Sequence, residues 1–476
     1  MSIWNKAEKL LKPLQRFAKS ERGNVAMMAG IAAIPLVITG GSAIDYERAV
    51  NAKIQLYASL DSAALYAASL TDTTDAALTT KAQIYVQQNY KNNTDATLSG
   101  FAIKNNGTTV TATANVQLHN YFMSMVGYPT TTVAAGSTVS KMGINLEVSL
   151  VLDNTGSMNS TNPQTGNSAI ADLKSSAVKF VNMVMPATQG LFYTKIAAIP
   201  YNNSVNLGTE AVAATARGPT VIGTSTYPAL SGFQNYKFTS ANGILQNYPS
   251  TTCVTERQGP NAYNDSAFGA VVGLSAVGRF YGPPAYNGCN VTPLQPLTTS
   301  AAALNATINA MSAGGSTGGQ NGVAWGWYTL SPTVGIWSGV SVPAGYDKLT
   351  TTDLTQKVRK VMIMMTDAEY NSAYCNGVIS APSSISGSGS QDYQIPCSSP
   401  LGNSYVQSTA MCAAIKKSGV EVFVITFQLD KTIPQRVALT QNCATDASHI
   451  IDADATSLDA AFLSIANSII SMRISS

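Results

Sequence analysis

The sequence predicts an α/β domain with a mainly parallel sheet and helices on both faces, preceded by one transmembrane helix and a small helical and β-rich stalk. Strand-like and helix-like segments alternate over residues 143–476, which is typical of such a sheet. The segment 361–365 is apolar throughout, as strands covered on both faces are. An uncharged stretch at 23–44 predicts the transmembrane helix.

The uncharged stretch is long enough to cross a bilayer. In helical form residues 23–44 would extend roughly 33 Å. Residues 1–22 carry six basic and two acidic side chains, which gives +4 and leaves −1 for the rest of the chain. By the positive-inside rule we expect a cytoplasmic basic tail at 1–22, a membrane segment at 23–45, and all later residues on the far side. A cleaved signal peptide and a buried core helix are the alternatives.

Residues 46–142 are expected to form a helical stalk and a small β-rich module. From 46 to 70 apolar residues recur at three- and four-residue steps, which predicts a helix. Its Ala-rich stripe is expected to pack within a hairpin rather than on a partner helix. Residues 109–117 then alternate apolar and small polar side chains, which is the pattern of a strand, and Asn105-Asn-Gly107 is a hairpin-turn signal.

The large domain is expected at 143–476, and two stretches within it depart from the alternation of strands and helices. Residues 208–298 and about 370–400 are rich in turn-forming residues and are predicted to be loop insertions. The predicted strands are 144–153, 195–201, 358–366, 420–427 and 449–452, and the predicted helices are 169–185, 300–312, 320–330, 404–418 and 456–472.

The composition excludes some classes of function. Charged residues are only 11% of the chain, against about a quarter in a typical soluble domain, which favours an exported protein. The body after the basic tail is nearly neutral and has no basic stripe, so no nucleic-acid partner is expected.

The six cysteines are predicted to form three disulfides. The count is even, none stands in a Cys-x-x-Cys pair, and an exported domain is oxidised. With only two histidines in the chain, an ordinary zinc site is excluded. Six buried free thiols are the alternative. Because each pair brackets a loop or two neighbouring elements, we expect Cys253–Cys289, Cys375–Cys397 and Cys412–Cys443.

Two predicted strands each deliver a carboxylate to their C-terminal ends, where open α/β sheets bind ligands. Asp153 ends the first and is followed by Thr155 and Ser157, and Asp367 follows the second. Between them in sequence, a Gly-rich loop at 314–319 can present Thr317. Carboxylates and hydroxyls are hard oxygen ligands that suit Mg²⁺, Mn²⁺ or Ca²⁺. The alternative is that both Asp residues cap helices and Thr317 is a turn residue.

These residues resemble the von Willebrand factor type A domain and its metal-ion-dependent adhesion site. In that family the first loop reads Asp-x-Ser-x-Ser, and here Thr155 replaces the first Ser but keeps the Oγ atom. Ala368 stands where the family commonly has Gly. The resemblance implies a site that holds one divalent cation, Mg²⁺ first with Mn²⁺ or Ca²⁺ as alternatives, and that takes an acidic side chain from a protein partner. The implied ligands are Asp153, Thr155, Ser157, Thr317 and Asp367.

Other stretches resemble the TadG-like proteins of tight-adherence (Flp) pilus assembly. They are Arg22-Gly-Asn-Val-Ala-Met27, the helix around 55–65, and Trp325-Gly-Trp-Tyr-Thr-Leu-Ser-Pro332. Met28 stands where related pseudopilins carry Glu, so we expect no cleavage after Gly23.

The resemblance implies a single-pass protein of the bacterial inner membrane, with its bulk in the periplasm or cell exterior. It would act in pilus assembly or adhesion and bind pilus or envelope components. It would not be an enzyme. A minor pilin-like structural subunit and a metal-dependent hydrolase are the alternatives.

Overall fold

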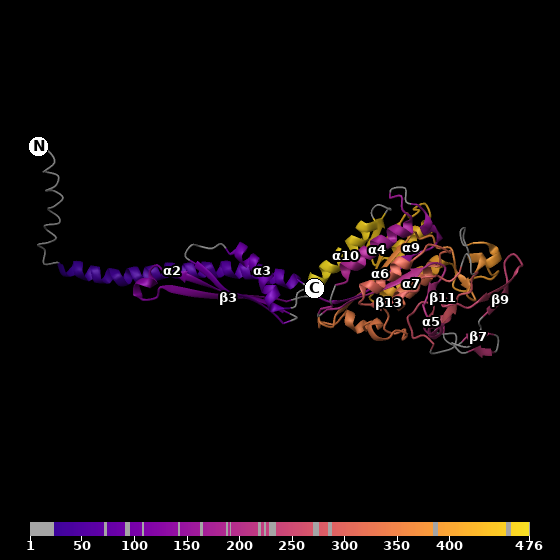
Figure 1. Ribbon diagram of the computed structural model, residues 1–476, viewed down its shortest axis with the longest axis horizontal. Coiled ribbons are helices and arrows are strands. Elements are labelled where there is room, and N and C mark those ends of the chain that lie inside the picture. Colours follow the sequence, from indigo (N-terminus) through magenta and orange to yellow (C-terminus); the bar gives the residue numbers. More distant parts are fainter. Residues whose placement is uncertain are drawn as a thin grey trace, which may run out of the picture. The chain divides into compact units, whose positions relative to one another are not determined.

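A computed structural model describes residues 23–475, except for 71–73, 91–95, 107–108, 141–142, 162–164, 187–188, 191, 218–219, 223–224, 228–234, 270–275, 284–287, 384–388 and 454–457. The chain divides into two compact units, Met1–Lys141 and Met142–Ser476, and Figure 1 labels some of their elements. Each unit is described by itself.

The small unit contains a long helix, a shorter helix and an antiparallel sheet of three strands in the order β1-β2-β3. Their bounds are α2 (Gly23–Ser69), α3 (Asp75–Asn89), β1 (Ala96–Asn105), β2 (Thr109–His119) and β3 (Thr130–Ser140). Within the described part of the chain, α2 is the one helix that is long and apolar enough to cross a membrane.

Alternation along β2 builds the core of the small unit. Val110, Val116 and every second residue between them are buried, and they face the apolar stripe of α2 that includes Leu56 and Leu60. Helix α3 packs on the same cluster. The predicted packing of the Ala-rich helix within its own module is therefore confirmed. Earlier side chains of α2, such as Ile31, remain exposed because no part of this unit covers them.

The large unit is built on a six-stranded sheet in the order β13-β5-β4-β14-β17-β18. All neighbouring strands are parallel except β13, which pairs with β5 in the antiparallel direction at one edge. The predicted α/β class with a mainly parallel sheet is therefore confirmed. The strands are β4 (Asn145–Asp153), β5 (Thr194–Tyr201), β13 (Gln295–Thr298), β14 (Val358–Thr366), β17 (Glu421–Phe427) and β18 (Ile450–Ala453).

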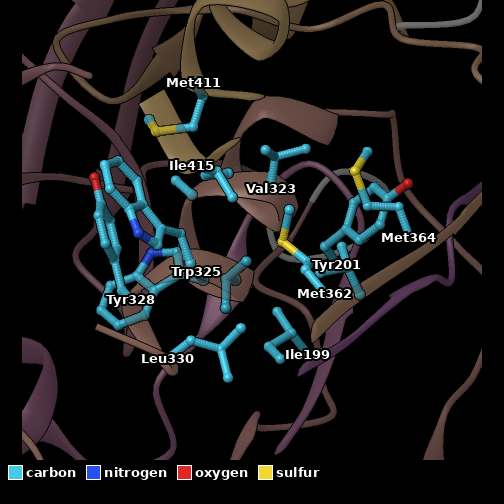
Figure 2. Packing of buried hydrophobic residues seen from close by; sticks show 14 of the residues in the cluster. Ile199, Tyr201, Val323, Trp325, Tyr328, Leu330, Met362, Met364, Met411 and Ile415 are labelled. Atoms are coloured by element: carbon cyan, nitrogen blue, oxygen red, sulfur yellow. The ribbon is translucent and has the colours of Figure 1, made fainter. Parts of the chain in front are cut away.

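Helices cover both faces of this sheet, and successive side chains of each central strand enter opposite cores. Figure 2 shows the core under α7 and α8, where Trp325 and Tyr328 pack against Met362 of β14 and Ile199 of β5. The helices on this face are α7 (Gly319–Tyr328), α8 (Ser404–Lys417) and α9 (Pro434–Cys443), and those on the other face are α4 (Ala169–Val184), α6 (Ala301–Ala310) and α10 (Leu458–Ser475).

One strand of the main sheet and one of the helices that cover it were not predicted from the sequence. The edge strand β13 lies inside the stretch 208–298, which was expected to be an insertion throughout. It is short and contains Pro296, which a sheet tolerates at an edge. Helix α9 was missed because much of its surface is polar and only Leu439, Thr440 and Cys443 are buried.

The two interrupting stretches contain short elements of their own. They include α5 (Glu210–Arg217), β7 (Thr220–Ile222), β8 (Ser225–Tyr227), β9 (Asn235–Thr239), β10 (Leu245–Pro249), β11 (Cys253–Arg257), β12 (Val277–Arg279), β15 (Tyr374–Cys375) and β16 (Val378–Ile379). β6 (Val205–Asn206) joins β11 and β12 in a small sheet. The 3₁₀ helices of the chain are η1 (Met123–Val126), η2 (Gly156–Asn159), η3 (Gly259–Asn261), η4 (Gly339–Ser341), η5 (Tyr346–Leu349), η6 (Ala381–Ser383), η7 (Gln391–Tyr393) and η8 (Ala447–His449).

All six cysteines are paired as expected. The disulfides are Cys253–Cys289, Cys375–Cys397 and Cys412–Cys443. The first ties β11 to the loop before β13, and the second closes the loop after β15. The third joins α8 to α9 beneath the surface, where both cysteines are fully buried.

Candidate metal centre

Asp153 ends β4 as a fully buried carboxylate. Its Oδ1 atom accepts hydrogen bonds from the backbone N–H and the Oγ1 of Thr155, at 3.0 and 2.7 Å. Thr155 Oγ1 in turn lies 3.1 Å from Ser157 Oγ. The first predicted loop therefore brings one carboxylate and two hydroxyls together.

The second carboxylate comes from the neighbouring strand. β4 and β14 are adjacent and parallel, so Asp153 and Asp367 follow the same edge of the sheet. Burial and, secondarily, the nearby charge of Asp367 together raise the pKa of Asp153 to about 7, although hydrogen bonds from Thr155 and Tyr201 act in the opposite direction. Asp367 is itself only 8% exposed. Two buried carboxylates thus lie near one another at the C-terminal edge of the sheet.

The Gly-rich loop is held against both of these segments through its backbone. The N–H of Gly156 donates to the carbonyl of Gly315 at 3.0 Å, which joins the Gly-rich loop to the loop that follows Asp153. Thr317 donates its N–H to Asn371 Oδ1 at 2.8 Å, and its carbonyl accepts from the N–H of Asn371 at 3.0 Å. The Gly-rich loop therefore contacts both carboxylate-bearing loops, through Gly315 on one side and Thr317 on the other.

Gly315 and Gly319 of this loop are required by the packing of the protein itself. Gly315 has φ +78°, and a Cβ there would stand 2.6 Å from Asn203 Oδ1. A Cβ on Gly319 would overlap the ring of Tyr370. Packing therefore accounts for these two glycines, since Asn203 and Tyr370 occupy the space that a side chain would need.

Ala368 adopts a left-handed backbone conformation with φ +56°. This explains why glycine is common there in the family that the site resembles, since glycine adopts that conformation without strain. Here alanine is held by two contacts. Its N–H donates to Thr366 Oγ1 at 2.9 Å, and its carbonyl accepts from Tyr405 OH at 2.9 Å.

Sequence reasoning missed two residues that hold Asp153 in place. Its Oδ2 atom accepts from Tyr201 OH at 2.8 Å and from Thr366 Oγ1 at 2.9 Å. Burial raises the pKa of Tyr201 well above its ordinary value, and the adjacent Asp153 adds to the effect, so the phenol stays protonated as a donor. The sequence offered one signal for Tyr201, which is its position at the end of a predicted strand. In the structure this strand, β5, lies next to β4, and Tyr201 pairs with Asp153 in register.

Hydrogen bonding within the first loop is not by itself evidence for a metal. Asp353 accepts from the N–H and Oγ1 of Thr355 in the same way, at 3.0 and 2.6 Å, and Asp430 repeats the pattern with Thr432. Both of these carboxylates are exposed. What distinguishes Asp153 is its complete burial and the second carboxylate beside it.

The residues present suit a hard divalent cation. Two carboxylates supply the charge that such an ion needs, and three hydroxyls supply neutral oxygen ligands. Among the residues that the structure describes, no group of three or more His, Cys, Asp and Glu side chains could hold a metal. The site is therefore suited to an ion only if the hydroxyls contribute, as the resemblance implies.

Other polar residues near the site have ordinary partners. Glu369, which follows Asp367 closely in sequence, forms an ion pair with Arg436 at 3.0 Å and is partly exposed. His449 contacts Asp446 Oδ1 through Nδ1 at 2.8 Å. The aromatic side chains of Trp325 and Tyr328 are buried in the core, as expected.

Comparison with known proteins identifies the N-terminal segment. Residues 23–70 match the family model Tad, described as Flp pilus-assembly TadE/G-like. No curated protein matches the chain.

Several solved structures are similar to this chain at low identity. The von Willebrand factor domain of the type V pilus tip protein Mfa5 from Porphyromonas gingivalis is 13% identical, with a TM-score of 0.35, and the match covers 70% of this chain and 97% of that one. The pilus adhesin SpaC from Lactobacillus rhamnosus GG is 15% identical, with a TM-score of 0.33, over 80% of this chain and 35% of that one. The PilB minor pilin from Streptococcus sanguinis is 13% identical, with a TM-score of 0.33, over 79% of each chain.

The long helix α2 lies wholly within the matched residues, so the match rests on the apolar helix and its Ala-rich continuation. Over residues 23–70, this chain carries the segment of the TadE/G-like Flp pilus-assembly family.

Proposed function

We propose that this protein is anchored by α2 in the bacterial inner membrane, faces the periplasm, and binds an acidic side chain of a pilus or envelope partner at the candidate metal centre. The observation that carries the proposal is the buried pair Asp153 and Asp367 at the C-terminal edge of the sheet. Such a pair is unfavourable without a cation, because both like charges are removed from water.

Each residue has a distinct role in this proposal. Asp153 and Asp367 would supply the negative charge, and Thr155, Ser157 and Thr317 would supply neutral oxygens. Tyr201 and Thr366 orient Asp153 through its second oxygen. A bound Mg²⁺ would offer a coordination position to a carboxylate oxygen of the partner.

We propose binding rather than turnover. A metal-dependent hydrolase needs a base beside the metal. The two histidines lie elsewhere, since His119 ends β2 in the small unit and His449 contacts Asp446.

Asp153→Asn is expected to abolish the stabilisation of the large unit by Mg²⁺ or Mn²⁺. In the wild type, an ion present at about 100 times its Kd should raise the unfolding free energy by about 2.7 kcal/mol. The variant keeps the shape of the side chain but removes one of two charges that hold the ion. Thermal unfolding of the full chain in detergent, with each metal or with EDTA, measures the difference.

Asp353→Asn is the matched control, because Asp353 forms the same local turn on the surface. It should respond to metal as the wild type does. Calorimetric titration with Mg²⁺ gives an independent readout. If wild type and Asp153→Asn bind the ion equally, or neither binds it, the two carboxylates only cap local turns and the proposal is wrong.

A reporter that is active only in the periplasm should be active when fused after residue 140, because the charge around residues 23–44 favours this orientation. The same reporter fused after residue 20 should be silent, since that fusion lacks the apolar helix. Activity of a cytoplasmic reporter at residue 140, with silence of the periplasmic one, would contradict the orientation.

A further inference from the structure

The turn between β2 and β3 carries an apolar, aromatic surface that the small unit leaves uncovered. This β2–β3 loop, residues 121–128, reads Tyr-Phe-Met-Ser-Met-Val-Gly-Tyr and has no charged residue. Met125 is 72% exposed and Tyr128 63%, and Tyr121 and Val126 are about half exposed. Exposure of several large apolar side chains on one short loop marks an interaction surface.

Asp45 of α2 fixes this loop to the helix. Its carboxylate accepts three consecutive backbone N–H groups, from Tyr121 at 3.0 Å, Phe122 at 2.8 Å and Met123 at 2.9 Å. Hydrogen bonds to an ionised carboxylate are stronger than neutral ones. The side chain of Asp45 is buried by the contact, so the loop is held in one position on the helix.

Glycine and arginine complete the attachment. A Cβ on Gly41 would overlap the ring of Phe122, so only glycine allows this close approach. One turn beyond Asp45, Arg48 donates to the carbonyl of His119 at 3.0 Å, and its guanidinium lies 3.9 Å from the ring centre of Tyr121. The loop therefore contacts α2 from Gly41 to Arg48.

That contact coincides with the end of the apolar stretch of α2. The uncharged stretch ends at Ile44, and the next residue, Asp45, is the first charged residue after it. Exposed side chains such as Ile31 and Leu36 precede it, and Tyr46, 73% exposed, follows it. Tyrosine is enriched where membrane helices leave the hydrocarbon. A helix that spans the bilayer with residues 23–44 would place the β2–β3 loop at the bilayer surface.

The sheet formed by β1, β2 and β3 runs along α2 in the direction away from the apolar stretch. Ser137 of β3 donates to Asp61 of α2 at 3.0 Å. Asp61 lies about 24 Å further along the helix than Asp45, at 1.5 Å per residue. Only the loop end of the sheet is therefore near the bilayer.

We propose that the β2–β3 loop inserts into the boundary between headgroups and acyl chains, and forms a second membrane contact beside α2. The proposal rests on the membrane anchoring in the proposed function. A lipid surface is favoured over a protein groove because the loop itself carries no charged residue and packs where the apolar stretch of α2 ends, with the carboxylate of Asp45 buried beneath it. Tyrosines also lie at the two ends of the loop. Two contacts would fix the tilt and rotation of α2, which one helix alone leaves free.

Depth-dependent quenching tests the proposal on the full chain. All six cysteines are in disulfides, so one introduced cysteine can be labelled selectively with a fluorophore. Three exposed positions are compared after reconstitution into phosphatidylethanolamine and phosphatidylglycerol vesicles that contain brominated lipid. They are Met125→Cys in the loop, Ile31→Cys in the apolar stretch, and Thr138→Cys near the far end of the sheet.

Labels at positions 31 and 125 should be quenched several-fold more strongly than the label at 138. If position 31 is quenched but 125 matches 138, the loop does not enter the bilayer, while the anchor stands. If position 31 is not quenched, the anchor itself is wrong, and this inference falls with it. A label at 125 with blue-shifted emission that brominated lipid does not quench would show that protein covers the loop, which also overturns the proposal.

Discussion

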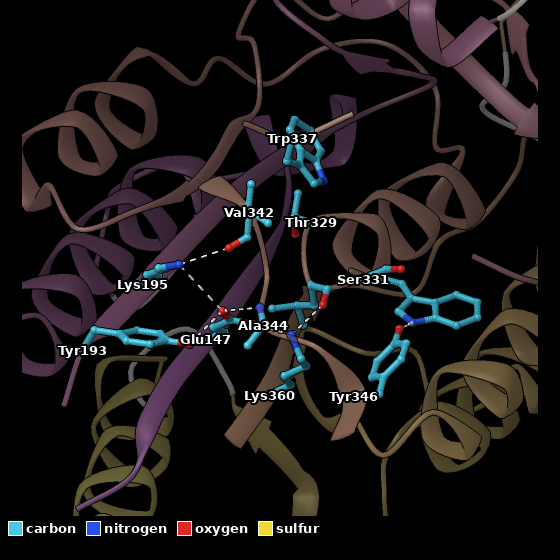
Figure 3. Close-up of polar contacts among 12 residues, drawn as sticks. Glu147, Tyr193, Lys195, Thr329, Ser331, Trp337, Val342, Ala344, Tyr346 and Lys360 are labelled. Carbon is cyan, nitrogen blue, oxygen red and sulfur yellow. Dashed lines mark hydrogen bonds and ion pairs between the residues drawn. The ribbon is translucent and has the colours of Figure 1, made fainter. Parts of the chain in front are cut away.

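Lys360→Met is expected to destabilise the large unit by about 3–5 kcal/mol, because it leaves a buried carboxylate without its cation. Lys360 on β14 and Glu147 on β4 are cross-strand neighbours, and both side chains are fully buried. Figure 3 shows their ion pair, which connects the two central strands. Both residues lie near the starts of their strands, whereas Asp153 and Asp367 lie at or just beyond the strand ends. Burial lowers the pKa of Lys360, and Glu147 opposes that shift.

The pair also holds a loop that passes over the sheet edge. Glu147 Oε1 accepts from the N–H of Ala344 at 2.9 Å and from Tyr193 OH at 3.2 Å, and Lys360 donates to the carbonyl of Leu330 at 2.8 Å (Figure 3). Lys195 lies 4.0 Å from the same carboxylate, farther than Lys360, so it is expected to compensate only in part for the loss of Lys360. Removing Lys360 should therefore loosen the loop as well as the strands.

Denaturant unfolding of the full chain in detergent, followed by tryptophan fluorescence, measures the effect, since Trp325, Trp327 and Trp337 all lie in the large unit. Arg359→Met is the matched control from the same strand. Its partner Glu421 is partly exposed, so a loss of about 1 kcal/mol or less is expected.

The double variant Glu147→Gln/Lys360→Met should recover most of the lost stability, because no charge then remains buried. Equal small losses for Lys360→Met and Arg359→Met would show that the buried pair has no special role.

Glu256→Gln is expected to raise the unfolding free energy at pH 8 by about 3 kcal/mol at most, because the folded protein holds the pKa of Glu256 well above its value in the unfolded chain. Glu256 lies on β11 and is buried, and burial raises its pKa from 4.5 to about 7. The unfolded chain releases this proton near pH 4.5, whereas the folded protein retains it until about pH 7. The contribution of Glu256 is therefore fully present below pH 4.5 and is lost as the pH rises to about 7.

The groups around Glu256 do not supply a compensating positive charge. Tyr374 donates its N–H to Glu256 Oε1 at 3.0 Å, and the side-chain amides of Gln320 and Gln407 lie beside the carboxyl group. Burial raises the pKa of the Tyr263 phenol, and the negative charge of Glu256 raises it in the same direction. Arg257, next on the strand, instead donates to the carbonyls of Asn264 and Ser266.

The unfolding free energies of the wild type and of Glu256→Gln are measured at intervals from pH 5 to pH 8. The difference between them at each pH tests this prediction. Because other groups titrate equally in both, the difference isolates Glu256. It should grow with pH and level off above about pH 7. A constant difference would mean that Glu256 is ionised in the folded protein throughout this range.

The sequence determined the class of the large unit because its central strands are apolar throughout and alternate with helical segments. It also determined the cysteine pairing, since each pair brackets a loop or two neighbouring elements. The candidate site was visible for the same reason. Asp153 and Asp367 each follow an apolar strand, and parallel strands bring such positions to one edge.

Only the tertiary structure decided which distant residues support these features. Tyr201 and Thr366 hold Asp153, and Lys360 pairs with Glu147 over 213 positions of sequence. These contacts depend on the register between neighbouring strands, where a shift of one residue turns every side chain to the opposite face. Likewise, Asp45 fixes a loop 76 positions away. Local patterns record which surface of an element is buried, but not which partner it meets, because the partner is chosen by packing of the whole chain.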